Sequence, residues 1–289
     1  MAKKLAIVVT HGIGTAPKDF DKALKGELRQ RVGSSLWRDI HWIPVHWSPV
    51  LTPRQDKLSA RMKKRSRWNW VRGFVIDNLS DASAYQYKGR TTARHKVSAY
   101  YEINDRFYQA LKKARTAGKV DDNTHVICIA QSMGCHVLSN YIWDMSTEPR
   151  RVTDETVNPF VRMDRLSGFF MTGCNIPLLL MAFAETHQVP IKVPGAGVTF
   201  AAPEAMWETY FDKDDLLGYP LRPTYATYYA GNVPGFPFDA AKEVKINDNT
   251  ISSGGLISGM TPYSHTQYWE DSEFLDPLEA GIRKIHALI

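Results

Sequence analysis

The chain has 289 residues, of which 44% are hydrophobic, 23% charged and 11% aromatic. This composition indicates a folded globular protein and excludes disordered, collagen-like and coiled-coil proteins. The formal net charge at pH 7 is +6, an excess too small to indicate a nucleic-acid partner by itself.

Strands and helices are predicted in alternation from the N-terminus. Residues 5–10 form a continuous apolar, β-branched run, which is typical of a strand buried on both faces. Residues 17–32 repeat apolar side chains every four positions, as a helix does, and residues 40–47 predict a second strand. Pro44 within this strand indicates an edge position or a bend, because proline cannot donate a backbone hydrogen bond.

The alternation continues through the second half of the chain. We expect a helix over 97–117, a strand over 125–130, a helix over 132–145, strands over 166–173, 205–211 and 243–247, and a closing helix over 275–287. This order predicts an α/β protein with a mostly parallel sheet covered by helices on both faces. In such folds the reactive site lies at the carboxyl edge of the strands.

One stretch breaks the alternation and is rich in basic and aromatic residues. Residues 54–96 contain twelve Lys or Arg and three Asp, a net charge of +9, so the rest of the chain is slightly acidic. We interpret residues 51–96 as a cap or lid inserted into a single domain that spans residues 1–289. The aromatic side chains interleaved with these charges are those of Trp68, Trp70, Phe74, Tyr85 and Tyr87.

Three functions are consistent with this insertion. A lid over the active site, or a plain cap with a solvated charged face, is the interpretation we favour. An anionic membrane surface is the next, because basic residues meet lipid headgroups while aromatic residues enter the interface. Nucleic acid comes last and is not expected as a partner, because nothing else in the chain indicates a nucleic-acid module.

Targeting and cysteine signals point to the cytoplasm. The apolar run over 5–9 is too short for the core of a signal peptide, and no window approaches the roughly 20 apolar residues of a membrane-spanning helix. The three cysteines, Cys128, Cys135 and Cys174, lack the spacing of a zinc or redox motif. We therefore expect reduced thiols in a cytoplasmic protein, with peripheral attachment at a membrane if the insertion binds one.

A candidate nucleophile follows the strand expected over 125–130. This strand runs directly into Gln-Ser-Met-Gly at 131–134 and then into a helix. A serine on such a sharp turn projects its hydroxyl from the sheet edge, and the crowded positions two before and two after it have to be very small. Here they are Ala130 and Gly134. A Ser-x-Gly sequence also ends ordinary strands, so it is the position between strand and helix that makes Ser132 a candidate nucleophile.

A second glycine-containing segment follows the first strand. It reads Thr-His-Gly-Ile-Gly over residues 10–14. Glycines there let backbone N–H groups point into a cavity where negative charge develops. A simple turn is the alternative, and a phosphate-binding loop is disfavoured because its Lys-Ser/Thr ending is missing.

The segments 11–14 and 130–134, His-Gly-Ile-Gly and Ala-Gln-Ser-Met-Gly, resemble the serine esterase and lipase side of the α/β-hydrolase superfamily. The resemblance spans nearly the whole chain apart from the basic insertion, and it departs from the G-x-S-x-G pattern at Ala130. It implies an α/β-hydrolase fold, in which the insertion is a cap or lid. It also implies the chain order nucleophile, acid, histidine.

The resemblance implies an acid just past a late strand and a histidine on a loop before the last helix. Asp215 fits the acid best, because an apolar pair and Gly218 follow it. Asp214 is the alternative, and a solvated acidic turn that also includes Asp212 is the remaining interpretation. Of the nine histidines, only His265 lies between the last expected strand and the final helix.

These roles imply a serine hydrolase that cleaves carboxylic esters through an acyl-enzyme on Ser132. His265 would remove the proton of the serine, and Asp215 would orient the imidazole. The backbone N–H groups of Ile13 and Met133 would hold the oxyanion. The reaction needs no metal and no organic cofactor, and its substrate would be a small-molecule or lipid ester.

Two alternatives to ester hydrolysis remain open in the sequence. The same three residues would serve a thioesterase or an acyltransferase. A non-catalytic binding or membrane-surface protein that keeps the fold is the other alternative. The retention of all three residue types in the right order argues against a loss of catalysis.

Overall fold

The computed structural model describes residues 2–62, 81–86, 97–195, 200, 204–252, 265 and 267–289. Within these residues, six strands form one all-parallel sheet in the spatial order β2-β1-β3-β4-β5-β6. The sheet confirms the α/β class and the parallel arrangement predicted from the sequence. Its strands are β1 (Leu5–Thr10), β2 (Ile40–Val45), β3 (His125–Gln131), β4 (Leu166–Thr172), β5 (Met206–Phe211) and β6 (Asn247–Thr250).

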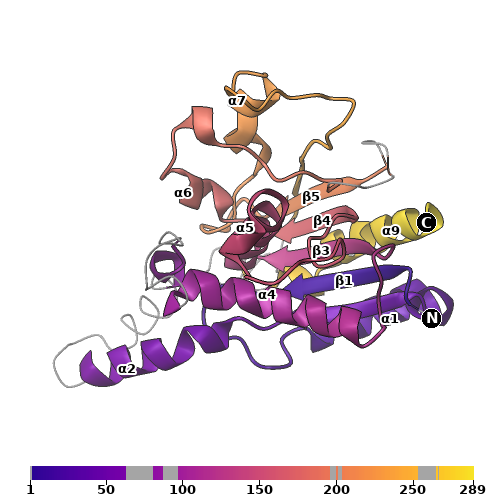
Figure 1. Ribbon diagram of the computed structural model, residues 1–289, viewed down its shortest axis with the longest axis horizontal. Coiled ribbons are helices and arrows are strands. Elements are labelled where there is room, and N and C mark those ends of the chain that lie inside the picture. Colours follow the sequence, from indigo (N-terminus) through magenta and orange to yellow (C-terminus); the bar gives the residue numbers. More distant parts are fainter. Residues whose placement is uncertain are drawn as a thin grey trace.

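Helices cover both faces of the sheet. Figure 1 shows α4 (Ala99–Thr116) and α5 (Met133–Thr147) in front of it, and α1 (Lys22–Trp37) and α9 (Ser272–Ala287) behind it. The central strands β1, β3 and β4 are buried along nearly their whole length, because both of their faces meet helices. The edge position expected from Pro44 is confirmed, since β2 pairs with β1 alone among the described strands.

The first helix begins later than its apolar spacing predicts. Residues 17–21 form turns instead. Phe20 N–H donates to Pro17 C=O at 3.1 Å, and Lys22 N–H donates to Asp19 C=O at 2.9 Å. The helix then runs past the expected end at residue 32 to Trp37, with a kink at Gly33, whose φ is +80°. The turn matters for the site, since it leaves Phe20 beside the pocket described below.

The last strand lies at 247–250, not at the predicted 243–247. The predicted segment turns away, and Val244 N–H donates to Val193 C=O instead of to the sheet. This polar strand pairs in parallel with β5, and its side chains add to the pairing, since the amides of Asn247 and Asn249 each donate to Glu208 of β5 at 2.9 Å. The apolar alternation of the sequence gave no sign of this amide–carboxylate pairing.

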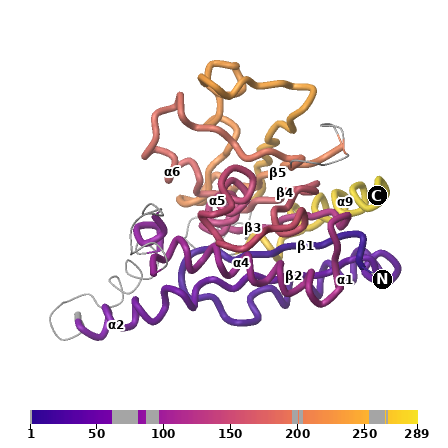
Figure 2. Tube along the Cα trace, viewed as in Figure 1, coloured from indigo at the N-terminus to yellow at the C-terminus, as the bar shows by residue number. Residues whose placement is uncertain are grey.

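Short helices and turns fill the carboxyl end of the sheet. Helix α2 projects from this end, and α6 and α7 lie above the β5 side in the Cα trace (Figure 2). The bounds are α2 (Thr52–Met62), α6 (Ile176–Leu180), α7 (Ala226–Tyr229) and the 3-10 turns Ser48–Val50, Pro149–Arg151, Glu185–His187, Arg222–Tyr225 and Tyr268–Glu270. Among the helices described, none combines the length and the apolar character needed to cross a bilayer.

Only parts of the insertion predicted over 51–96 lie within the described residues: α2 and residues 81–86. Trp68, Trp70, Phe74 and Tyr87 lie outside them, so the predicted lid stays a prediction. Tyr85 is described, and its buried ring stacks on Tyr100 of α4 with centroids 4.7 Å apart. This described piece of the insertion is therefore packed into the body of the protein.

Candidate active site

Ser132 sits at the turn between β3 and α5, as the sequence predicted. Its backbone has φ +52° and ψ −127°, a region that non-glycine residues rarely adopt. The residue is 1% exposed. Strain of this kind persists only where the surroundings impose it, and it is concentrated at functional sites.

Two glycines permit this tight turn to pack against the end of β1. A Cβ on Gly134 would lie 2.4 Å from the backbone oxygen of His11, so no larger residue fits there. A Cβ on Gly12 would lie 2.8 Å from Ser132 Cβ and 3.4 Å from its Oγ. The segment 10–14 is therefore in direct contact with the serine, at the carboxyl edge of neighbouring strands.

Asp215 and His265, 50 residues apart in the chain, form a buried pair. His265 Nδ1 lies 2.7 Å from Asp215 Oδ2, and the two side chains are 9% and 1% exposed. Asp214 is exposed, and its described contact is a backbone N–H bond to Asp212. The structure thus joins the histidine to Asp215, and it places Asp214 outside this contact.

From the described residues, the Asp215 carboxylate accepts three hydrogen bonds. Besides His265, Tyr268 Oη–H donates to Oδ2 at 2.7 Å, and Leu217 N–H donates to Oδ1 at 2.9 Å. Burial alone raises the pKa of Asp215, but these hydrogen bonds and the imidazole outweigh it, so the pKa lies below its ordinary value. The carboxylate is therefore held in its ionised form, which is the form that orients an imidazole.

Ser132 and His265 line the same pocket. Within the described residues, Ser132 Oγ and His265 Nε2 are buried atoms without a hydrogen-bond partner. The pocket has a volume of about 360 Å³, within the range of small-molecule sites. The other lining residues are largely apolar: His11, Gly12, Ile13, Thr15, Ala16, Pro17, Phe20, Ala23, Leu24, Gln131, Leu217, Trp269 and Glu270.

His11 holds the segment that was predicted to bind an oxyanion. Its Nδ1 lies 2.8 Å from Gly12 C=O, and its Nε2 accepts the N–H groups of Trp47 at 3.2 Å and Ser48 at 3.4 Å. Nε2 is thus the acceptor nitrogen and Nδ1 carries the proton. Burial lowers the pKa of His11 to about 3, so the imidazole stays neutral.

The two predicted oxyanion donors occupy different surroundings. Ile13 lines the pocket beside Gly12. Met133 is the first residue of α5 and is 1% exposed, and a helix leaves its first N–H groups without intrahelical partners. Met133 does not itself line the pocket, but its N–H follows Ser132 directly.

Sequence reasoning missed three supporting residues. Tyr268 binds Asp215, and Gln131 Nε2 donates to the backbone oxygen of His265 at 2.7 Å. Asp81, from the insertion, accepts Gly14 N–H at 2.9 Å and the side-chain amide of Gln55 at 2.7 Å. No motif marks Tyr268 or Asp81, and the motif that contains Gln131 does not show its contact with His265, because each of these residues acts through a contact between distant parts of the chain.

The described residues include no group of three or more His, Cys, Asp or Glu side chains placed to hold a metal ion. All three cysteines are buried and free, and burial raises the pKa of Cys128 and Cys135. Buried thiols with raised pKa values are poor nucleophiles.

No protein-family model matches the sequence. No curated protein matches it. The structure is similar to that of a cutinase-like protein from Cryptococcus sp., at a TM-score of 0.40 and 10% identity, over 98% of this chain and 95% of the other. It is also similar to an acetyl xylan esterase, at a TM-score of 0.39 and 8% identity, over 99% and 100%.

A third similar structure is that of RedJ with a polyethylene glycol molecule bound in its active site. It matches at a TM-score of 0.42 and 12% identity, over 100% of this chain and 90% of the other. Similarity at these scores and identities identifies no reaction.

Proposed function

We propose that the chain is a serine hydrolase of the α/β-hydrolase type that cleaves carboxylic esters through an acyl-enzyme on Ser132. One observation carries the proposal. A serine in a strained strand-to-helix turn shares a pocket with a histidine, and the Nδ1 of this histidine is hydrogen-bonded to a buried carboxylate. This combination supplies a nucleophile, a base and an orienting acid in one place.

The chemistry follows from these three groups. His265 Nε2 takes the proton of Ser132 Oγ as the oxygen attacks the ester carbonyl, and it later gives this proton to the leaving alkoxide. Asp215 keeps the proton on Nδ1 and stabilises the imidazolium that forms. Water, activated by the same imidazole, then hydrolyses the acyl-enzyme and releases the acid.

The oxyanion of the tetrahedral intermediate needs donors close to Ser132. The N–H groups of Ile13 and Met133 are the two we assign to this role, each worth about 3 kcal/mol in the transition state. The contact between Gly12 and Ser132 supports the assignment, because it brings the residue before Ile13 against the nucleophile. The hydrogen bonds of the His11 ring to Gly12 C=O and to the N–H groups of Trp47 and Ser48 fix the backbone of this segment before substrate binds.

The pocket supports an ester with an apolar group next to the carbonyl. Phe20, Leu24 and Trp269 line it, and apolar side chains dominate the rest of its wall. Its volume of about 360 Å³ lies near the lower end of the range for small-molecule sites. We therefore propose medium-length acyl chains as the preferred substrates.

The first test is covalent labelling with a fluorophosphonate, read by intact mass. We expect one adduct on the wild type and none on Ser132→Ala. Ser146→Ala is the matched control, because that serine lies exposed on the same helix and donates to Trp143 C=O. A wild type that takes no label, or a Ser132→Ala variant that still does, would contradict the proposal.

Chain length and leaving group are then separated on the same proteins. A series of p-nitrophenyl esters of increasing acyl length should show an optimum at medium length, with activity lost in Ser132→Ala. Matched thioesters distinguish a thioesterase, and added alcohols distinguish an acyltransferase. No feature of the described site favours either of these over ester hydrolysis.

A further inference from the structure

Tyr268 lies three residues after His265 and is fully buried. Its hydroxyl accepts Asp212 N–H at 2.9 Å and lies 2.7 Å from Asp215 Oδ2. A backbone N–H can only donate, so the hydroxyl proton is directed at the carboxylate. The same oxygen, Oδ2, is the one that receives His265 Nδ1–H at 2.7 Å.

We propose that Tyr268 is a positioning residue whose hydroxyl shares Asp215 Oδ2 with His265 and thereby sets how strongly the carboxylate holds the protonated imidazole. This inference rests on the proposed function, because the imidazole is the base of that reaction. A hydrogen bond to an anionic oxygen draws negative charge toward its donor. Less charge then faces His265, and the imidazolium is stabilised less.

The carboxylate stays in place when the hydroxyl is removed. Its other oxygen, Oδ1, is held by Leu217 N–H at 2.9 Å. A Cβ on Gly218 would lie only 2.4 Å from Oδ2, so the backbone is packed directly against the acid. Removing the phenol oxygen should therefore change the charge felt by His265 more than the position of Asp215.

The other titratable groups near His265 do not obscure this effect. Burial and Asp215 raise the pKa of Tyr268, so the phenol stays protonated. His11 shares the pocket but stays neutral, since its pKa is lowered to about 3. The carboxylates of Glu270 on the pocket and of Asp212 are present in both the wild type and a phenylalanine variant, so their charges cancel in a comparison, although the backbone N–H of Asp212 loses its acceptor in the variant.

The test is the pH dependence of kcat/KM in Tyr268→Phe. Full negative charge on Oδ2 should favour the imidazolium, so the acid limb of the profile should move to higher pH by about half a unit. Tyr141→Phe is the matched control, because it removes a buried tyrosine hydroxyl that donates to Val161 C=O, away from Asp215. An acid limb that stays in place in Tyr268→Phe, or moves to lower pH, would overturn the proposal.

A double-mutant cycle with Asp215→Asn tests the route of the effect. If Tyr268 acts through the carboxylate, Tyr268→Phe should alter kcat/KM several-fold in the wild type and hardly at all in Asp215→Asn. Equal effects in both backgrounds would overturn the proposal. Fluorophosphonate labelling of the wild type is run in parallel, so a failure of the proposed function is seen separately.

Replacement of Tyr268 by 3-fluorotyrosine covers the case in which the phenylalanine variant does not fold. The fluorinated phenol is a stronger donor and keeps both of its hydrogen bonds. We expect the acid limb to move to lower pH, opposite to Tyr268→Phe. An unchanged acid limb in the fluorinated protein would count against the proposal.

Discussion

Asp214 and Asp215 are neighbours in the chain with different surroundings. Asp215 is buried and accepts hydrogen bonds from three donors, one of them His265. Asp214 is exposed and lies one residue outside this arrangement. A carboxylate that orients an imidazole is buried and hydrogen-bonded, as Asp215 is, whereas a solvated carboxylate is exposed, as Asp214 is.

This difference predicts opposite results for two asparagine variants. Asp215→Asn should lower kcat about 10³- to 10⁴-fold, because the amide presents a donor to His265 Nδ1–H and favours the wrong tautomer. Asp214→Asn should leave kcat within about twofold, since the exposed side chain of Asp214 has no described hydrogen bond to His265 or Asp215. Steady-state rates on one p-nitrophenyl ester measure both. Equal losses in the two variants would mean that neither aspartate orients the imidazole.

At the scale of single elements, α1 contains two glycines that differ only in backbone conformation. Gly26 has helical φ and Gly33 has φ +80°, and an added Cβ would meet nothing within 4 Å at either position. An alanine side chain would therefore clash with no neighbour at either position, so the backbone conformation alone decides how alanine changes the free energy of unfolding. Glycine lowers helix stability relative to alanine where φ is helical, and it is favoured where φ is positive.

Gly26→Ala should therefore raise the free energy of unfolding by about 0.5–1 kcal/mol. Gly33→Ala should lower it by about 1–2 kcal/mol, because the residue has to hold a left-handed φ. Urea denaturation followed by circular dichroism measures both changes, and each variant serves as the other's control. Two shifts of the same sign would contradict the kink at Gly33.

The elements that could be predicted are those whose signal is local. Ser132 stands between a buried strand and a helix, and the ordering rule led to His265. Strand β6 was misplaced because its residues are polar and its contacts are distant: Asn247 and Asn249 meet Glu208 across 39 residues or more. Tyr268 was missed for the same reason, since only the fold brings it onto Asp215.

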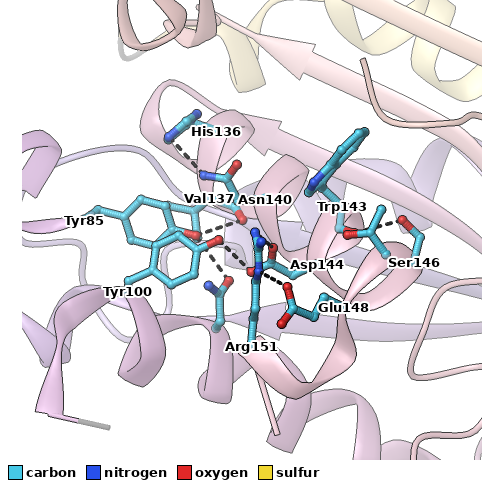
Figure 3. Close-up of polar contacts among 12 residues, drawn as sticks. Tyr85, Tyr100, His136, Val137, Asn140, Trp143, Asp144, Ser146, Glu148 and Arg151 are labelled. Carbon is cyan, nitrogen blue, oxygen red and sulfur yellow. Dashed lines mark hydrogen bonds and ion pairs between the residues drawn. The ribbon is translucent and has the colours of Figure 1, made fainter. Parts of the chain in front are cut away.

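At the scale of the whole molecule, a buried polar network joins the insertion to two helices of the body. Figure 3 shows Tyr85 and Tyr100 beside Asp144, with Arg151 reaching the same carboxylate. Tyr100 Oη–H donates to Asp144 Oδ2 at 2.6 Å, and Arg151 Nη1 lies 3.3 Å from Oδ1. Tyr85 Oη–H donates to Asn104 at 3.2 Å. Tyr85 thus ties the described end of the insertion to α4, and the buried Asp144 of α5 joins Tyr100 of α4 to Arg151.

Asp144 makes the stability of this assembly depend on pH. Burial raises its pKa to about 6, even though Tyr100 and Arg151 act in the opposite direction. The folded protein therefore binds a proton between about pH 4 and pH 6 that the unfolded chain has already lost. Stability from this group is present below that window and is lost as the pH rises through it.

The measurement that checks this is the free energy of unfolding of the wild type and Asp144→Asn from pH 4 to pH 8. The wild type should lose about 2 kcal/mol relative to the variant between about pH 4 and pH 6, and the difference should then stay constant. His136 and His125, whose pKa values burial lowers to about 4, are present in both proteins and cancel in the difference.

Tyr100→Phe removes a donor to the ionised carboxylate, so in that variant the window should extend to higher pH. Parallel curves for the wild type and Asp144→Asn would show that the carboxylate stays ionised in the fold, because only a proton bound at residue 144 makes the two proteins differ across this range.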